Sequence, residues 1–204
     1  MSKEKISKSL YVSIKNGWLS GDNYKEFKTE TYYKILDFFV VNTICEKLSC
    51  KGQNLKETAW GKDIWKKGEL RKELLGSIDN QSQTNQPSVF FAKNYSDLTD
   101  GINKLNIGKD FYKQREEKIL VYCKNNLTQI ENIFYHLRNA FAHGRFNIYE
   151  HKKQRYYVFE AAQVNLSKET AKLQARIILK ETTLLNWIKI INNPPQEERK
   201  STSK

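Results

Sequence analysis

Residues 134–144 read Phe134-Tyr135-His136-Leu137-Arg138-Asn139-Ala140-Phe141-Ala142-His143-Gly144, and they place an arginine, an amide and a histidine together where a helix is expected to end. Residues 113–143 contain neither proline nor glycine, so the sequence predicts the longest helix of the chain over this range. Gly144 follows at the position where helices commonly end in a left-handed backbone, which glycine adopts without steric strain. The three polar groups are therefore predicted to lie in the last turns of this helix.

On an ideal helix this stretch has two distinct faces. An apolar stripe about 60° wide is expected to face the core, and its residues are Leu127, Ile130, Phe134, Leu137 and Phe141. The opposite side carries His136, Asn139, Ala140 and His143. Both histidines are thus expected to point away from the core. Arg138 lies near the edge of the apolar stripe, about 140° around the axis from His143 and about 7.5 Å along it.

Arg138 and His143 can nevertheless meet in one cleft. The arginine can reach round the helix, the last turn can distort, or a second copy of the chain can bring both pairs together across a two-fold axis. The small side chains of Ala140 and Ala142 permit the close approach that the third arrangement needs. We therefore expect a homodimer.

The chain as a whole is predicted to be all-α, a bundle of about four to five helices with a small β-hairpin after the motif helix. Apolar spacings of three and four predict further helices over residues 27–48, 62–75, 96–108 and 165–191. The β-prone runs 145–149 and 155–159 flank a charged turn and predict the hairpin. Residues 1–193 are expected to form a single domain, with a disordered basic tail over 194–204. The polar run 79–86 predicts an exposed loop, whose role the sequence leaves open.

Charge and composition narrow the partners. The 204 residues include 35 Lys and Arg against 23 Asp and Glu, a net charge of +12, which favours polyanions, with nucleic acid ahead of a membrane surface. Three cysteines, Cys45, Cys50 and Cys123, form no CxxC pair, so neither a disulfide framework nor a zinc site is expected. A reducing, cytoplasmic location is predicted. No apolar run is long enough to span a membrane, and neither a metal nor a cofactor is expected.

Cutting RNA without a metal needs a base for the 2′-OH proton, an acid for the leaving 5′-oxygen and a cation for the charge that builds on phosphate. Imidazole and guanidinium groups supply these roles. The run Arg138-Asn139-Ala140-Phe141-Ala142-His143 resembles the R-x4-6-H motif of the HEPN superfamily, including the polar residue that these proteins often place after the arginine. HEPN domains are all-α bundles, and many are metal-independent endoribonucleases that dimerise to assemble their site.

The resemblance implies a role for each motif residue. His143 would be the catalytic acid or base, Arg138 the phosphate-binding partner and Asn139 the residue that orients them. The products would carry a 2′,3′-cyclic phosphate and a 5′-hydroxyl. His136 is a candidate accessory residue, which could join the site, bind a metal with His143 or stay solvated. The family implies an RNA-cleaving effector of phage defence or of a toxin–antitoxin system, with an antitoxin or activating protein as a candidate partner.

The sequence is also compatible with other functions. The chain could be a catalytically inactive HEPN module that binds RNA or a protein partner, or a structural helical adaptor. Arg145 and His151 also satisfy the motif spacing, but they fall in the predicted hairpin, where no bundle helix presents them. Arg145 also stands where some HEPN toxins carry a tyrosine that a nucleotidyltransferase antitoxin modifies, so that regulation lacks its target residue here.

Overall fold

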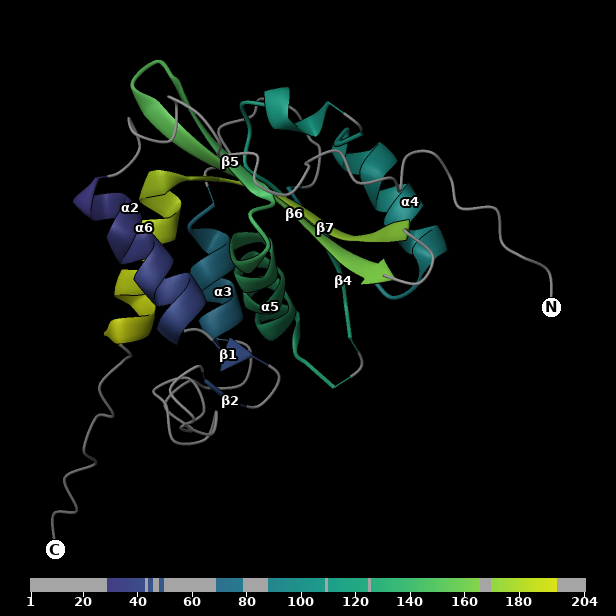
Figure 1. The fold of residues 1–204 in the computed structure, drawn as a ribbon, viewed down its shortest axis with the longest axis horizontal. Coiled ribbons are helices and arrows are strands. Elements are labelled where there is room, and N and C mark those ends of the chain that lie inside the picture. Colours follow the sequence, from purple (N-terminus) through teal and green to yellow (C-terminus); the bar gives the residue numbers. More distant parts are fainter. Residues whose placement is uncertain are drawn as a thin grey trace, which may run out of the picture.

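The computed structural model describes residues 29–42, 44–45, 48–49, 69–78, 88–108, 110–124, 126–165 and 170–193 (Figure 1). Their central element is a five-stranded mixed sheet in the order β3-β4-β7-β6-β5. The strands are β3 (Val89–Ala92), β4 (Lys118–Tyr122), β5 (Phe146–His151), β6 (Gln154–Asn165) and β7 (Thr170–Lys180). β3 is parallel to β4, and all other neighbours are antiparallel. The predicted all-α bundle is therefore wrong, and the fold is mixed α/β.

Two strands of the five-stranded sheet occupy sequence that was predicted to be helical. The predicted helix 113–143 is β4 followed by α5 (Gln129–Ala142), and the predicted helix 165–191 is β7 followed by α6 (Glu181–Asn192). β4 contains Ile119, Leu120 and Val121, which are all fully buried because both faces of the sheet are covered. A strand buried on both faces shows no alternation of apolar and polar residues, so periodicity alone does not distinguish it from a buried helix.

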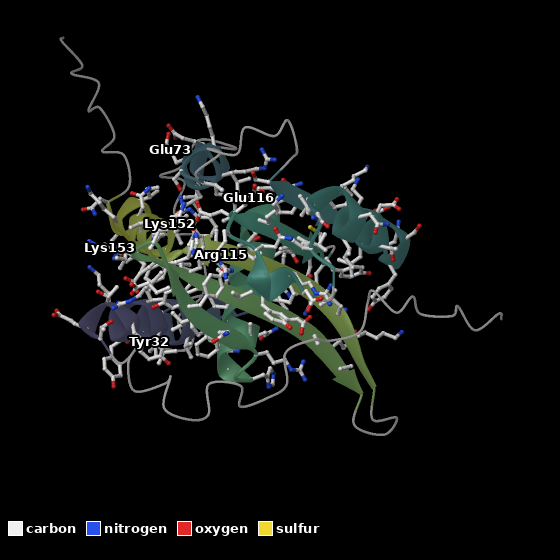
Figure 2. All side chains as sticks on the ribbon, turned by 90° about the horizontal axis from the view of Figure 1, so that it is seen from above. Tyr32, Glu73, Arg115, Glu116, Lys152 and Lys153 are labelled. Atoms are coloured by element: carbon white, nitrogen blue, oxygen red, sulfur yellow. The ribbon has the colours of Figure 1, made fainter. Side chains whose placement is uncertain are left out.

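The predicted hairpin is confirmed. β5 and β6 pair from Phe146↔Phe159 to His151↔Gln154. Between them, Lys152 and Lys153 have φ values of 48° and 63°, the positive values that both central residues of a type I′ turn require. The two lysines are exposed at the tip of the hairpin, where Figure 2 labels them.

Most helices lie on one face of the sheet (Figure 1). There α5 packs on β6 and β4, and around it lie α2 (Glu30–Leu36), the π-helical turn η2 (Asp37–Asn42), α3 (Glu69–Gly76) and α6. The ring of Phe134 on α5 stacks on Phe39 of η2, with centroids 5.4 Å apart, and its centroid lies 5.6 Å from that of Trp187 on α6. The sheet and the helices together bury α5 on several sides.

α4 (Tyr95–Leu105) covers the opposite face, over β3 and β4 (Figure 1). The Asn94 side chain caps its start by accepting a hydrogen bond from the Asp97 backbone N–H at 2.8 Å. Asn106 ends it with a left-handed φ of 52°. The short helix predicted over residues 96–108 is therefore confirmed, with Asn94 as its N-cap.

A buried ion pair lies between the sheet and the segment that follows α4. Glu160 of β6 and Arg176 of β7 are cross-strand neighbours, and their Oε1 and Nε atoms lie 3.0 Å apart. The same guanidinium donates from Nη1 to the carbonyl oxygen of Ile107 at 2.9 Å and lies 5.0 Å from the centroid of the Phe111 ring. Charge and hydrogen bonding thus tie two sheet strands to the chain beyond α4.

The N-terminal helices are shorter than predicted. In place of one helix over residues 27–48, α2 and η2 carry the chain to Asn42, and the short strands β1 (Ile44–Cys45) and β2 (Leu48–Ser49) follow. α3 confirms the second half of the predicted helix 62–75. The first half of that helix, the predicted loop 79–86 and the predicted tail 194–204 lie outside the described residues.

Candidate functional site

The end of α5 is set by its backbone. The Arg145 N–H donates to the carbonyl oxygen of Ala140 at 2.8 Å, and the Gly144 N–H donates to that of Phe141 at 3.0 Å. Gly144 has a φ of 61°. These are the features of a Schellman motif, so the predicted glycine stop is confirmed. His143 is the residue immediately before this turn, and its backbone position is fixed by these hydrogen bonds.

Only one side of α5 keeps accessible surface over its last turns. We call this side the exposed stripe, and its residues are Tyr135, Arg138, Asn139, Ala142 and His143. Arg138 and Asn139 are half-buried, and His143 is exposed. All three predicted catalytic residues therefore share the exposed stripe, because the sheet and the neighbouring helices cover the rest of the helix.

His143 presents its ring to solvent at the C-cap of α5. Its backbone N–H donates to the carbonyl oxygen of Asn139 at 3.1 Å, whereas its imidazole has no hydrogen-bond partner in the part of the chain that the structure describes. Next to it, Ala142 is exposed, but Ala140 is buried against the core. Of the two small residues expected to permit close approach of a second copy, only Ala142 lies at the surface.

His136 faces the interior, so the prediction that both histidines point away from the core is wrong. It is 1% exposed, and its Nε2 lies 2.9 Å from the carbonyl oxygen of Tyr122. Since the carbonyl can only accept, Nε2 carries the proton and donates it. Burial lowers the pKa of His136 to about 4, with the hydrogen bond to Tyr122 acting in the opposite direction. His136 is a neutral group that joins α5 to the end of β4.

The hairpin separates Arg145 and His151, the second pair that matches the motif spacing. Arg145 is buried at the start of the hairpin, where burial lowers its pKa and the charge of Glu160 opposes that shift. His151 is exposed at the far end of β5. Six residues of extended strand separate the two positions by about 20 Å. The structure does not bring Arg145 and His151 together.

A pocket of about 230 Å³ opens beside the first part of the exposed stripe. We call it the α5 pocket. It lies where α5, the end of β4 and the strands β6 and β7 meet, and its lining residues are Tyr122, Lys124, Tyr135, His136, Asn139, Ala161, Ala162, Gln163 and Gln174. Asn139, a predicted site residue, belongs to both the α5 pocket and the exposed stripe.

Aromatic and amide groups hold the walls of the α5 pocket in place. The Tyr122 ring stacks on Tyr95 of α4, with centroids 5.3 Å apart. The hydroxyl oxygen of Tyr95 accepts a hydrogen bond from Nε2 of Gln174 at 2.8 Å. On the other side, the Lys124 ammonium lies 3.9 Å from the centroid of the Tyr135 ring. Each of the two tyrosines that line the pocket therefore has a ring contact, Tyr122 with Tyr95 and Tyr135 with Lys124.

Few local features of the sequence indicate this pocket. Tyr135, His136 and Asn139 lie at helical spacing in the predicted motif helix, but the remaining walls come from segments near residues 122, 162 and 174. Those segments meet only because β7 pairs with both β4 and β6. A signal existed in the β-branched and aromatic content of β4, which favours a strand.

Comparisons with protein-family models, with curated proteins and with solved structures find no match for this chain. The resemblance to HEPN proteins therefore rests on the motif residues, and its all-α fold is overturned by the sheet. Across the described ranges, no three His, Cys, Asp or Glu residues gather as a metal-binding group. In those same ranges, no helix has the length and apolar character needed to cross a bilayer.

Proposed function

We propose that this chain is a metal-independent endoribonuclease that acts as a homodimer through Arg138, Asn139 and His143. One observation carries the proposal: these residues share the single accessible side of α5, and the imidazole of His143 is exposed there. A buried arginine or histidine in this motif would have been a structural residue. The exposed imidazole of His143 is instead accessible to a phosphodiester.

The chemistry follows from the imidazole of His143 and the guanidinium of Arg138. Neutral imidazole of His143 takes the proton of a ribose 2′-OH, and the 2′-oxygen attacks the adjacent phosphorus. The bond from phosphorus to the 5′-oxygen breaks, and that oxygen takes a proton from an imidazolium. Arg138 offers a planar, permanently charged fork to the phosphate oxygens as their negative charge grows. The products are a 2′,3′-cyclic phosphate and a 5′-hydroxyl.

A second copy completes the set of groups. The reaction needs a base and an acid, and each chain offers one exposed motif histidine. A two-fold axis beside Ala142 would place the motif histidine of the second copy on the other side of the scissile bond, because a two-fold interface apposes identical surfaces. The small side chain of Ala142 leaves room for this approach.

The charge of the chain favours RNA as the substrate. A net charge of +12 draws a polyanion to the surface and strengthens contacts to phosphates. The amides and rings beside the exposed stripe add groups that can bind a nucleotide. A cytoplasmic place of action belongs to the same proposal, since cellular RNA is made and used there.

The test is cleavage of end-labelled RNA in excess EDTA. Wild type and His151→Ala should cut and leave cyclic phosphate ends, whereas His143→Ala should lose at least about 100-fold in rate, as expected for loss of a general acid or base. His151 is the matched control because it is an exposed histidine on the hairpin. Arg138→Ala should lower both the cleavage rate and the affinity for RNA.

Other results would reject the proposal. Equal cutting by wild type and His143→Ala would place the activity elsewhere. Binding of RNA by wild type without any cutting would favour the inactive RNA-binding module instead.

A role as a defence or toxin effector extends the proposal to the cell. Induced expression of wild type should stop growth of a bacterial host and leave cellular RNAs with cyclic phosphate ends. His143→Ala, expressed to the same level, should do neither. Growth arrest by both variants would show that toxicity comes from the basic surface rather than from cleavage.

A further inference from the structure

We propose that the α5 pocket binds one unstacked base of a single-stranded RNA, beside the phosphate on which Arg138 and His143 act. This inference rests on the proposed function and names the form of its substrate. The pocket supplies three features that a base needs: aromatic walls, amide groups at its edges and an interior with little charge.

Tyr122 and Tyr135 provide the aromatic walls. Both are half-buried, so each keeps part of its ring accessible in the pocket. The stack of Tyr122 on Tyr95 and the ammonium of Lys124 over Tyr135 hold the rings in position before any ligand arrives. Tyrosine rings are the platforms on which proteins stack unpaired bases, and a fixed ring loses little freedom on binding.

Three amides surround the same space. The side chains of Asn139 and Gln163 have no hydrogen-bond partner among the described residues, so each keeps a donor and an acceptor for a ligand. Gln174 uses its Nε2 group on Tyr95 and Leu173, which leaves its carbonyl oxygen as an acceptor. Paired donors and acceptors of this kind match the edge of a nucleobase.

The charges in the lining favour a base over a phosphate. Lys124 is the one lining residue with a permanent charge, and its ammonium is engaged on the Tyr135 ring. His136 hydrogen-bonds a backbone carbonyl through Nε2 and does not offer a cation. A free phosphate would have only this one ammonium to balance its charge, whereas a neutral base needs no balancing charge.

The position of the pocket suits a nucleotide next to the cleaved bond. Asn139 lines the pocket and lies one helical turn before His143, about 6 Å along the axis of α5. A base held against Asn139 would therefore keep its own phosphate near the exposed stripe. In a duplex the bases are stacked and paired, so they cannot enter the pocket, and single strands are the expected substrate.

Binding of a fluorescein-labelled RNA of about ten nucleotides tests the inference, in a His143→Ala background that prevents cutting. At about 0.2 M salt, where contacts to phosphates alone are weak, fluorescence anisotropy reports the affinity. Tyr135→Ala should weaken binding by about 5-fold to 100-fold, the effect of losing one stacked base. Tyr135→Phe keeps the ring and should bind within about twofold of the parent.

Two further variants test whether the loss of RNA binding is specific to the α5 pocket. Tyr33→Ala removes an exposed tyrosine of α2 and should leave the affinity unchanged. Ala162→Leu adds volume to the pocket from the β6 side and retains Tyr135, and it should weaken binding while circular dichroism shows a folded protein. The same RNA annealed to its complement should bind less tightly than the single strand.

The outcomes separate this inference from the proposed nuclease. Equal affinity for Tyr135→Ala and Tyr33→Ala, or equal binding of single strand and duplex, would overturn the base site. If wild type cuts RNA and Tyr135→Ala leaves KM unchanged, the nuclease stands and the base site fails. If wild type does not cut but Tyr135→Ala and Ala162→Leu both lose binding, the base site stands and the nuclease fails.

Discussion

At the scale of single residues, His136 makes the stability of the protein depend on pH. Its ring donates to the carbonyl oxygen of Tyr122, and burial lowers its pKa from 6.5 to about 4. Between these values the unfolded chain binds a proton that the folded chain excludes. The contribution of this residue to the free energy of unfolding is therefore at its full value above about pH 6.5. It decreases as the pH falls toward 4, by roughly 3 kcal/mol in total.

Urea unfolding at about pH 7 and about pH 4.5 measures this effect. His136→Gln should be less stable than wild type at neutral pH, but should lose less stability on acidification. His151→Gln, which changes an exposed histidine, should retain the wild-type slope. An unchanged slope in His136→Gln would show that His136 does not titrate as the structure indicates.

Lys153, at the tip of the hairpin, has an unfavourable backbone conformation. Its φ of 63° is unfavourable for any side chain with a Cβ, and a type I′ turn prefers glycine at this position. Lys153→Gly should stabilise the protein by about 1 kcal/mol. Lys153→Ala keeps the Cβ and should not, and thermal unfolding would compare the two. A gain in both variants would assign the effect to charge rather than to the backbone.

At the scale of elements, α4 sits close to the sheet because it carries a glycine. A Cβ at Gly101 would lie 2.4 Å from Cδ1 of Leu120 and 2.7 Å from Cδ1 of Phe90. Gly101→Ala should therefore destabilise the protein by about 1–3 kcal/mol, although alanine favours helix. Gly76→Ala is the matched control, because a Cβ there has no neighbour within 4 Å. Chemical denaturation should show a loss for Gly101→Ala alone.

The elements that sequence predicts well are those with local signals. The end of α5 follows from Gly144, and the hairpin follows from two β-prone runs around a charged turn. The start of α5 also has a local signal, because Thr128 and Glu131 form a capping box, with the Thr128 N–H donating to the Glu131 carboxylate at 2.6 Å. The capping box therefore indicates that the helix begins after β4 and does not include it.

β7 lacks such a signal. Its residues Ile177, Ile178 and Leu179 are all fully buried, since the sheet has a core on each face. Consecutive apolar residues then fit a helix as well as a strand. The candidate site follows the same division: Arg138, Asn139 and His143 are close in sequence and could be predicted as a group, whereas Gln163 and Gln174 reach the pocket only through strand pairing.

At the scale of the whole molecule, the proposed nuclease depends on a dimer. Ala142→Glu adds a bulky anion to the exposed stripe on both copies, and like charges apposed across a two-fold axis repel. Sedimentation equilibrium should show a dimer for wild type and a shift toward monomer for the variant, together with a fall in cleavage of at least about tenfold. Ser96→Glu on α4 is the exposed control. A monomeric wild type with full activity would refute the two-copy site.

The strand order determines how much of the chain must be translated before the sheet can form. β7 comes last in sequence among the five strands, yet it lies in the middle of the sheet, between β4 and β6. Until it arrives, β3 with β4 and β5 with β6 are separate two-stranded pieces, which have little stability alone. A chain still being translated thus has neither the pocket nor a firmly seated α5. A ribosome that stalls before residue 180 would therefore release a chain that lacks the central strand of the sheet.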